Sequence, residues 1–222
     1  MKRVQVDRIL RQFDHVVRQI ISATGSQTTL KEIATASTHD LEEIWDTNTT
    51  VAAAVEVPVH DLISRTVKQN CDTVAVCAWD GELTYFELED LSTRLAILLI
   101  RRHVGVGTVV PLCFEKSMWM PVAMLGVMKA GGASVAMDVT QPPARLRRIV
   151  EQVQPILILS SLENESLSSE LLGFPVQTLG SETFLNNDHC GESDLPNVRA
   201  DDVFHIVFTS GSTGEPKGTI IT

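Results

Sequence analysis

Apolar side chains recur every three or four positions near the start of the chain. The residues that follow this period are Val6, Ile9, Leu10, Phe13, Val17 and Ile20. Such spacing places one apolar stripe along a helix, and Asp7 and Asp14 each stand four positions before an arginine, which stabilises the same structure. We therefore predict an amphipathic helix over 6–21. Because its polar face carries both signs of charge, we expect it to dock on a protein core and not on a membrane surface.

The pattern becomes irregular between this helix and Pro58, where Thr, Ser and Ala dominate. Only the stretch from Asp40 to Trp45 keeps a helical period. Clusters of small and hydroxyl residues without periodicity are typical of connecting segments. We therefore expect a linker over 25–55 and a main domain that begins at residue 56.

Beyond this point, helical and extended patterns alternate. We predict helices over 59–69, 85–103, 117–130 and 143–153. We predict strands over 73–78, 82–85, 108–114, 133–137, 156–160, 175–179 and 203–208. Strands that alternate with helices indicate an α/β domain with a largely parallel sheet.

Several residues mark where these elements begin and end. The pair Asp80-Gly81 between the first two strands indicates a tight hairpin. Thr84 and Glu87 have the spacing of a capping box, in which two side chains satisfy the first free amides of a helix. We expect Gly105 to stop that helix and Ser117 to open the next one.

Composition and charge narrow the class of protein. With 44% hydrophobic and 21% charged residues, the chain is typical of soluble globular proteins. Its net charge of -10 and its lack of a basic run predict no basic surface that could bind nucleic acid. The charged N-terminus lacks the apolar core of a secretory signal, and no apolar run is long enough to span a bilayer. We therefore expect a cytoplasmic protein with no nucleic-acid and no membrane partner.

The four cysteines are Cys71, Cys77, Cys113 and Cys190. No pair has zinc-ligand spacing, so we interpret them as reduced thiols and predict no metal site. The first three lie in or beside apolar segments, where we expect buried structural cysteines.

The stretch FTSGSTGEPKG, residues 208–218, concentrates glycines, hydroxyl side chains and one lysine. A phosphate-binding loop needs converging backbone N–H groups, glycines that let the backbone approach, and donors that follow the charge. The glycines are Gly211, Gly214 and Gly218, and the side-chain donors are Thr209, Ser210, Ser212, Thr213 and Lys217. A flexible polar turn is the alternative. The lysine and the apolar β-type runs on both sides favour phosphate binding.

This stretch does not fit the P-loop of common NTPases, which has a second glycine directly before its lysine and a helix after it. Pro216 stands in place of that glycine, and the residues after Gly218 are β-branched. We therefore predict that the loop joins two strands, so that a helix dipole is not its main source of positive potential.

The residues TSGSTGEPKG resemble the phosphate loop of the adenylate-forming superfamily, which includes acyl-CoA ligases, luciferases and the adenylation domains of nonribosomal peptide synthetases. LTYFEL at 83–88 resembles an early signature of the adenylation domains, and VMKAGGASVAMD at 127–138, followed by QPPARLRRIV, resembles their second signature. That signature usually has an aromatic residue where this chain has Ser134 and a proline where it has Ala136. LEEIWDTNTT at 41–50 resembles the passage from a condensation domain into an adenylation domain.

The resemblance implies a domain organisation. Residues 1–24 would be the C-terminal helix of a condensation domain, 25–55 a linker, and 56–222 the N-terminal part of an adenylation domain, truncated after the phosphate loop. The fold expected for the last part is an incomplete N-terminal subdomain of an adenylate-forming enzyme.

The resemblance also implies an activity. The parent enzyme would activate an amino acid or related carboxylic acid with ATP and Mg as an acyl adenylate, and load it onto the phosphopantetheine of a carrier domain. The residues expected to bind the ATP phosphates are Thr209, Ser210, Gly211, Ser212, Thr213, Gly214 and Lys217. No complete set of catalytic residues is expected. The alternative is a noncatalytic truncated product that at most binds nucleotide phosphate, or a partner that supplies the missing half.

Overall fold

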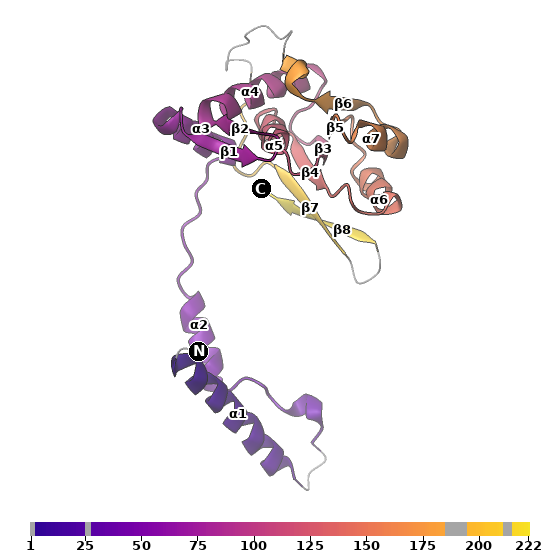
Figure 1. Cartoon of the computed structure of the whole chain (residues 1–222). Coiled ribbons are helices and arrows are strands. Elements are labelled where there is room, and N and C mark those ends of the chain that lie inside the picture. Colours follow the sequence, from indigo (N-terminus) through magenta and orange to yellow (C-terminus); the bar gives the residue numbers. More distant parts are fainter. Residues whose placement is uncertain (1–2, 25–27, 185–194, 211–214) are drawn as a thin grey trace. The chain divides into compact units, whose positions relative to one another are not determined.

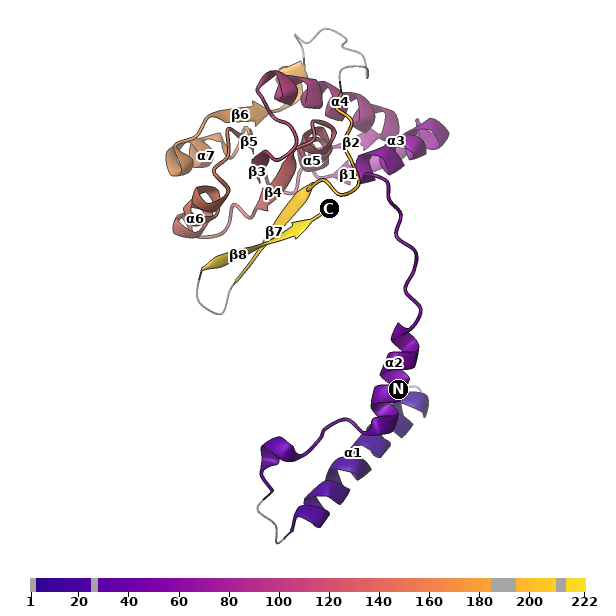
Figure 2. The same ribbon diagram turned by 180° about the vertical axis from the view of Figure 1, so that it is seen from behind.

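The structure is a computed structural model that describes residues 3–24, 28–184, 195–210 and 215–222. The chain divides into two compact units, Met1–Val55 and Glu56–Thr222. Figure 1 and Figure 2 show their helices and strands from opposite sides. The second unit begins at residue 56, where the sequence predicts the start of the main domain. The assignment of the first unit to a condensation-domain helix and a linker stays a prediction.

The first unit contains α1 (Arg3–Ala23), the short 3-10 helix η1 (Leu30–Glu32) and α2 (Thr38–Asn48). Helix α1 covers the predicted helix and extends beyond it at both ends. Helix α2 begins at a capping box, because the Ser37 hydroxyl accepts from the Asp40 amide at 3.1 Å and the Asp40 carboxylate accepts from the Ser37 amide at 2.9 Å. The predicted linker is therefore partly helical.

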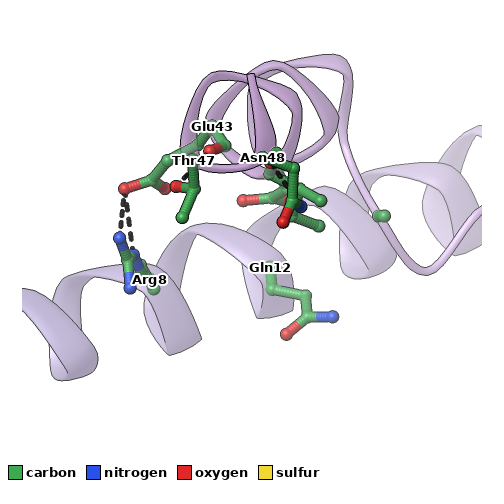
Figure 3. A pocket seen from close by; sticks show the side chains of 8 residues that line it. Arg8, Gln12, Glu43, Thr47 and Asn48 are labelled. Atoms are coloured by element: carbon green, nitrogen blue, oxygen red, sulfur yellow. Dashed lines mark hydrogen bonds and ion pairs between the residues drawn. The ribbon is translucent and has the colours of Figure 1, made fainter. Parts of the chain in front are cut away.

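Polar groups connect α2 and the segment before it to α1. The Gln19 side chain exchanges two hydrogen bonds with the backbone of Ala34, at 2.8 and 2.9 Å. Arg8 forms an ion pair with Glu43, and both side chains line a cavity of about 330 Å³ (Figure 3). No residue of α1, η1 or α2 is buried. Hydrogen bonds and charge, not an apolar core, therefore hold these helices together.

The second unit opens with α3 (Val59–Asn70), followed by β1 (Val74–Ala78), β2 (Gly81–Thr84) and α4 (Tyr85–Arg101). β1 and β2 form the predicted antiparallel hairpin. The predicted capping box is confirmed, because the Glu87 amide donates to the Thr84 hydroxyl at 3.2 Å and the Thr84 amide donates to the Glu87 carboxylate at 2.8 Å.

A sheet of six strands organises the rest of the unit. Its elements are β3 (Val109–Cys113), α5 (Trp119–Lys129), β4 (Ala133–Met137), α6 (Pro143–Val153), β5 (Ile158–Ser161), α7 (Glu165–Leu172), β6 (Val176–Leu179), η2 (Ser181–Phe184), β7 (His205–Ser210) and β8 (Pro216–Ile221). The strand order is β6-β5-β3-β4-β7-β8, and all neighbours are parallel except β7 and β8. The predicted α/β class with a largely parallel sheet is confirmed, whereas α7 was not predicted.

Helices cover both faces of this sheet (Figures 1 and 2). Strand β3 shows the alternation, because Val110 and Leu112 pack with α4 and α5 in one hydrophobic cluster, whereas Cys113 packs with α6 in the other. The helices α4 and α5 lie so close that a Cβ on Gly126 would stand 2.6 Å from a methyl carbon of the fully buried Leu95. This close contact requires a glycine.

Two aromatic rings stack in the hydrophobic cluster that contains Val110 and Leu112. The rings of Trp119 and Phe184 have centroids 6.0 Å apart and planes 14° from parallel. The Arg94 guanidinium carbon lies 5.3 Å from the Phe184 ring centroid. These contacts fasten η2 to the helices that cover the sheet.

Two predicted helix boundaries are wrong in their details. Helix α4 ends at Arg101, and His103 takes a positive φ of 66°, so the chain turns before Gly105. Ser117 does not cap α5. Instead, the Met118 amide donates to the Asp80 carboxylate at 2.9 Å, across 38 positions of sequence. The hairpin turn thus caps a distant helix, a contact that no local pattern encodes.

The cysteines are buried less than predicted. Cys113 is buried, and its burial raises the pKa of its thiol. Cys71 and Cys77 are exposed, because Cys71 follows the end of α3 and Cys77 lies on the outer side of the two-stranded hairpin. Cys190 lies outside the described residues. Within the described ranges, no helix is long and apolar enough to cross a membrane.

Candidate phosphate-binding hairpin

The strands β7 and β8 form an antiparallel hairpin, and the predicted loop connects them. Thr209 lies opposite Lys217, and Ser210 lies opposite Pro216. The prediction that strands flank the loop on both sides is therefore confirmed. Residues 211–214 lie outside the described residues.

The strand β7, which leads into this loop, ends at one particular edge of the sheet. Strand β7 runs parallel to β4, which runs parallel to β3. Ser210 therefore lies at the same edge as the carboxyl ends of these parallel strands. In open α/β sheets, ligands bind outside the carboxyl ends of the strands. The position of the candidate loop fits this rule.

Thr209 and Lys217 form a directly opposed pair on the hairpin, and both are exposed. Opposed residues of an antiparallel pair project to the same side of the sheet. Among the described residues, no carboxylate forms an ion pair with the Lys217 ammonium. The Thr209 hydroxyl donates to the Lys217 carbonyl at 3.5 Å. A hydroxyl group and a cation are therefore presented together, next to the loop.

Of the other predicted phosphate-binding residues, the structure describes only the backbone of Ser210. The backbone of Ser210 ends β7 next to Thr209. Gly211, Ser212, Thr213 and Gly214 are outside the described residues, so their part in the site stays a prediction.

Gly218 has a different role from the one that the sequence predicts. It lies inside β8, opposite Phe208, and is not among the described residues with a positive φ. A Cβ at this position would lie 3.1 Å from a methyl group of Ile206 and 3.2 Å from the Phe208 ring. The glycine therefore leaves room for these two side chains, and it does not supply a special loop conformation.

Two side chains of α6 contact the end of the loop that leads into β8. Arg148 lies 3.1 Å from the Glu215 carboxylate, and the Gln152 side-chain amide donates to the carbonyl of Pro216 at 3.2 Å. Arg148 lies within the stretch QPPARLRRIV, and Gln152 lies two positions after its end. The resemblance singled out that stretch, but its contact with the loop is 64 to 67 positions distant in sequence and was not predicted.

Ser134 joins the hairpin to the rest of the sheet. It is fully buried, its amide donates to the Phe204 carbonyl at 2.9 Å, and its hydroxyl lies 2.9 Å from Nδ1 of His205. Burial lowers the pKa of His205, which favours its neutral form. The departure from the usual aromatic residue at this position thus provides a polar partner for His205.

The sequence and the fold are similar to those of known proteins. A family model described as AMP-binding enzyme matches residues 63–222. The chain belongs to this family. It is 48% identical over 223 residues to the nonribosomal peptide synthetase ungA' of Aspergillus campestris, an alignment that covers 99% of this chain and 2% of that protein. It is 44% identical over 219 residues to peramine synthetase A of Epichloe festucae, covering 98% of this chain and 8% of that protein.

Solved structures of similar proteins agree with this family. One is the nonribosomal peptide synthetase FmoA3 in its α-methyl-L-serine-AMP bound form, with 26% identity and a TM-score of 0.70 over 85% of this chain and 20% of that one. Another is the N-terminal subdomain of NpsA from Klebsiella oxytoca in complex with 3-hydroxybenzoyl-AMSN, with 25% identity and a TM-score of 0.63 over 74% of this chain and 41% of that one.

These findings confirm the predicted resemblance to the AMP-binding family and to the nonribosomal peptide synthetases, together with the fold class. The chain spans 2% and 8% of the length of the two synthetases named above. Within the parts of the chain that the structure describes, no group of three or more His, Cys, Asp or Glu residues is arranged to hold a metal ion.

Proposed function

We propose that the chain is the first part of an adenylation domain in a longer nonribosomal peptide synthetase, and that this domain activates an amino acid or a related carboxylic acid with ATP. In the proposed reaction, a carboxylate oxygen attacks the α-phosphorus of ATP. The bond between that phosphorus and the bridging oxygen breaks, pyrophosphate leaves, and an acyl adenylate forms. The synthetases that match almost all of this chain support the proposal, as does the adenylate bound in the FmoA3 structure.

The proposed phosphate-binding residues are Thr209, Ser210, Gly211, Ser212, Thr213, Gly214 and Lys217. One observation carries this assignment: Thr209 and Lys217 are opposed on a hairpin whose strand β7 ends at the carboxyl edge of the parallel sheet. A hydrogen bond to a charged group contributes about 1.5 to 3 kcal/mol. A cation fixed where negative charge develops on the departing pyrophosphate lowers the barrier, because it interacts more strongly with the transition state than with bound ATP.

The resemblance to the family also implies a metal ion and neighbouring domains. Mg²⁺ would accompany ATP and neutralise part of its phosphate charge. A phosphopantetheine thiol on a carrier domain would receive the activated acid. On the N-terminal side, α1 exposes Ile9, Leu10 and Phe13, which fits a helix that packs on a preceding condensation domain. We expect the parent synthetase to be cytoplasmic.

The chain by itself is expected to form no acyl adenylate. Placing the carboxylate in line with the α-phosphorus accounts for about 7 to 11 kcal/mol of such a barrier, and the resemblance puts the groups that place it after Thr222. Assays of pyrophosphate exchange into ATP, with all proteinogenic amino acids present, compare the 222-residue chain with the parent synthetase. Exchange by the parent alone supports the proposed function. Exchange by the short chain above its Lys217→Ala variant contradicts this division of roles.

The assignment of the site is tested in the parent synthetase with Lys217→Ala. We expect pyrophosphate exchange to fall about a hundredfold, as when one charge-stabilising donor is removed from an active site, with little change in the KM of the amino acid. Lys68→Ala is the matched control, because Lys68 is also an exposed lysine of the second unit and lies on α3, away from the hairpin. Equal exchange rates for wild type and Lys217→Ala would contradict the proposal.

A further inference from the structure

The hairpin β7–β8 has few attachments to the rest of the sheet. Among the described residues, the register between β4 and β7 contains a single pair, Ser134 with His205, whereas β3 and β4 are paired over five residues. Within the same ranges, no strand pairs with the outer edge of β8. The backbone hydrogen bonds of the sheet therefore restrain the end of the hairpin next to the loop only weakly.

Helix α6 provides restraint at that end. Pro216 is buried, and its carbonyl accepts from the Gln152 side chain at 3.2 Å. One residue earlier, Glu215 accepts from Arg148 at 3.1 Å. The first residue of β8 and the residue before it are thus held by side chains one turn apart on one helix. The next residue is Lys217.

The space around this contact is incompletely filled. A cavity of about 260 Å³ lies between the start of α6 and β8, and it is lined by Pro142, Ala144, Arg145, Arg148 and Pro216. Continuous apolar packing does not fix the distance between α6 and β8 there. Ile206 and Phe208 of β7 pack against the hydrophobic cluster that contains Leu146, Ile149 and Val150 of α6. The start of β8 is restrained by its pairing with β7 and, from α6, by the two polar contacts.

We propose that Arg148 and Gln152 are positioning residues for the phosphate site: they fix the start of β8 and thereby the position of the Lys217 ammonium. This inference rests on the proposed role of Lys217. Neither side chain is proposed to touch ATP. Their effect is on the rate of the step in which pyrophosphate leaves, because a displaced cation stabilises the departing charge less.

A charge exchange between α6 and β8 tests the ion pair. In the parent synthetase, Arg148→Glu and Glu215→Arg each place like charges opposite one another, and we expect kcat/KM for ATP to fall about threefold in each. The double variant Arg148→Glu with Glu215→Arg restores an ion pair of opposite polarity and should return to within about twofold of wild type. Glu151→Arg, on α6, changes the net charge by the same amount as Glu215→Arg does and should leave kcat/KM unchanged.

Removal of the amide tests the second contact. Gln152→Leu keeps the size of the side chain but leaves the Pro216 carbonyl without this donor, and we expect kcat/KM for ATP to fall about tenfold. Gln152→Glu removes the amide nitrogen, and we expect a similar fall in kcat/KM for ATP. A KM for the amino acid equal to that of wild type separates displacement of Lys217 from general damage to the domain.

The outcomes distinguish this inference from the proposed function. If Lys217→Ala exchanges pyrophosphate at the wild-type rate, the role of Lys217 is wrong. If Lys217→Ala is impaired while Arg148→Glu and Gln152→Leu match wild type, the positioning role is wrong and the role of Lys217 stands. A double charge exchange that is as impaired as both single variants also overturns the positioning role.

Discussion

The two units of the chain contain similar amphipathic helices, yet only one unit has a core. In the first unit, Phe13 of α1 and Trp45 of α2 are 68% and 71% exposed. In the second unit, Leu95 and Leu112 are fully buried. The periodic apolar pattern is equally clear in α1 and in α6, whose Leu146, Ile149 and Val150 are buried. It therefore predicts a helix in both units, but burial also requires a sheet or a second apolar face to pack against, and only the second unit has one.

The two units should differ most in the free energy of unfolding that is lost when one buried and one exposed leucine are each replaced by alanine. Leu112→Ala removes a fully buried side chain from the central strand β3, and we expect a loss of about 2 to 5 kcal/mol in the free energy of unfolding. Leu41→Ala is the matched change in α2, where Leu41 is 46% exposed, and should cost less than about 0.5 kcal/mol. Urea unfolding of the chain followed by circular dichroism measures both, and equal losses would remove the contrast between the units.

A smaller loss in the free energy of unfolding is expected when a methyl group is added where the core is already tightly packed. Gly126→Ala directs a methyl group at Leu95 across the α4–α5 contact, and overpacking of this kind costs about 1 to 3 kcal/mol. Gly105→Ala is the control, because a Cβ at Gly105 would have no atom within 4 Å. Thermal unfolding should show a lower Tm for the first variant alone. A normal Tm for Gly126→Ala would mean that α4 and α5 adjust to extra volume.

The helices of the first unit should respond to changes in local hydrogen bonds instead. Ser37→Ala removes the capping hydroxyl of α2 and should cost about 1 kcal/mol of helix stability. Thr47→Ala, in the last turn of the same helix, removes a hydroxyl that donates to the Glu43 carbonyl, but introduces a residue that favours helices. Hydrogen exchange of the α2 amides should accelerate in the first variant and not in the second. Similar exchange in both would show that the capping box contributes little.

The smallest effect concerns pH. Burial lowers the pKa of His205 and of His60, so the unfolded chain binds protons at a higher pH than the folded one does. The stabilisation from these neutral histidines is complete above the unfolded pKa of about 6.5 and decreases as pH falls below it. Unfolding midpoints at pH 8 and pH 5.5 should differ less in His60→Gln with His205→Gln than in wild type. An unchanged difference would assign the pH dependence to other groups.

Local signals account for the elements that were predicted correctly. Pro143 at the start of α6 and the apolar period after it predict the bounds 143–153, which the structure reproduces. The serine-rich helix α7 was missed because its apolar residues are few and its serines favour turns as much as helices. The order of the strands was beyond prediction, because it depends on contacts between segments far apart in the sequence.

The candidate site was predictable to a similar extent. Glycines, hydroxyls and a lysine in one stretch predict a phosphate loop, and the β-branched residues after it correctly indicate a second strand. The role of Gly218 was wrong, because the neighbouring Phe208 ring that fills its space comes from the opposite strand. Arg148 and Gln152 could not be identified, since nothing in α6 itself shows which element lies opposite them.

The stack of Trp119 on Phe184 also has a spectroscopic consequence. The chain has three tryptophans, of which Trp45 and Trp79 are 71% and 69% exposed, whereas Trp119 lies against an aromatic ring. Water surrounds the two exposed indoles in the folded and the unfolded chain alike. A red shift of fluorescence emission during denaturation therefore comes mainly from Trp119. In a chain with Trp45→Phe and Trp79→Phe, the emission wavelength becomes an optical probe of the sheet domain alone.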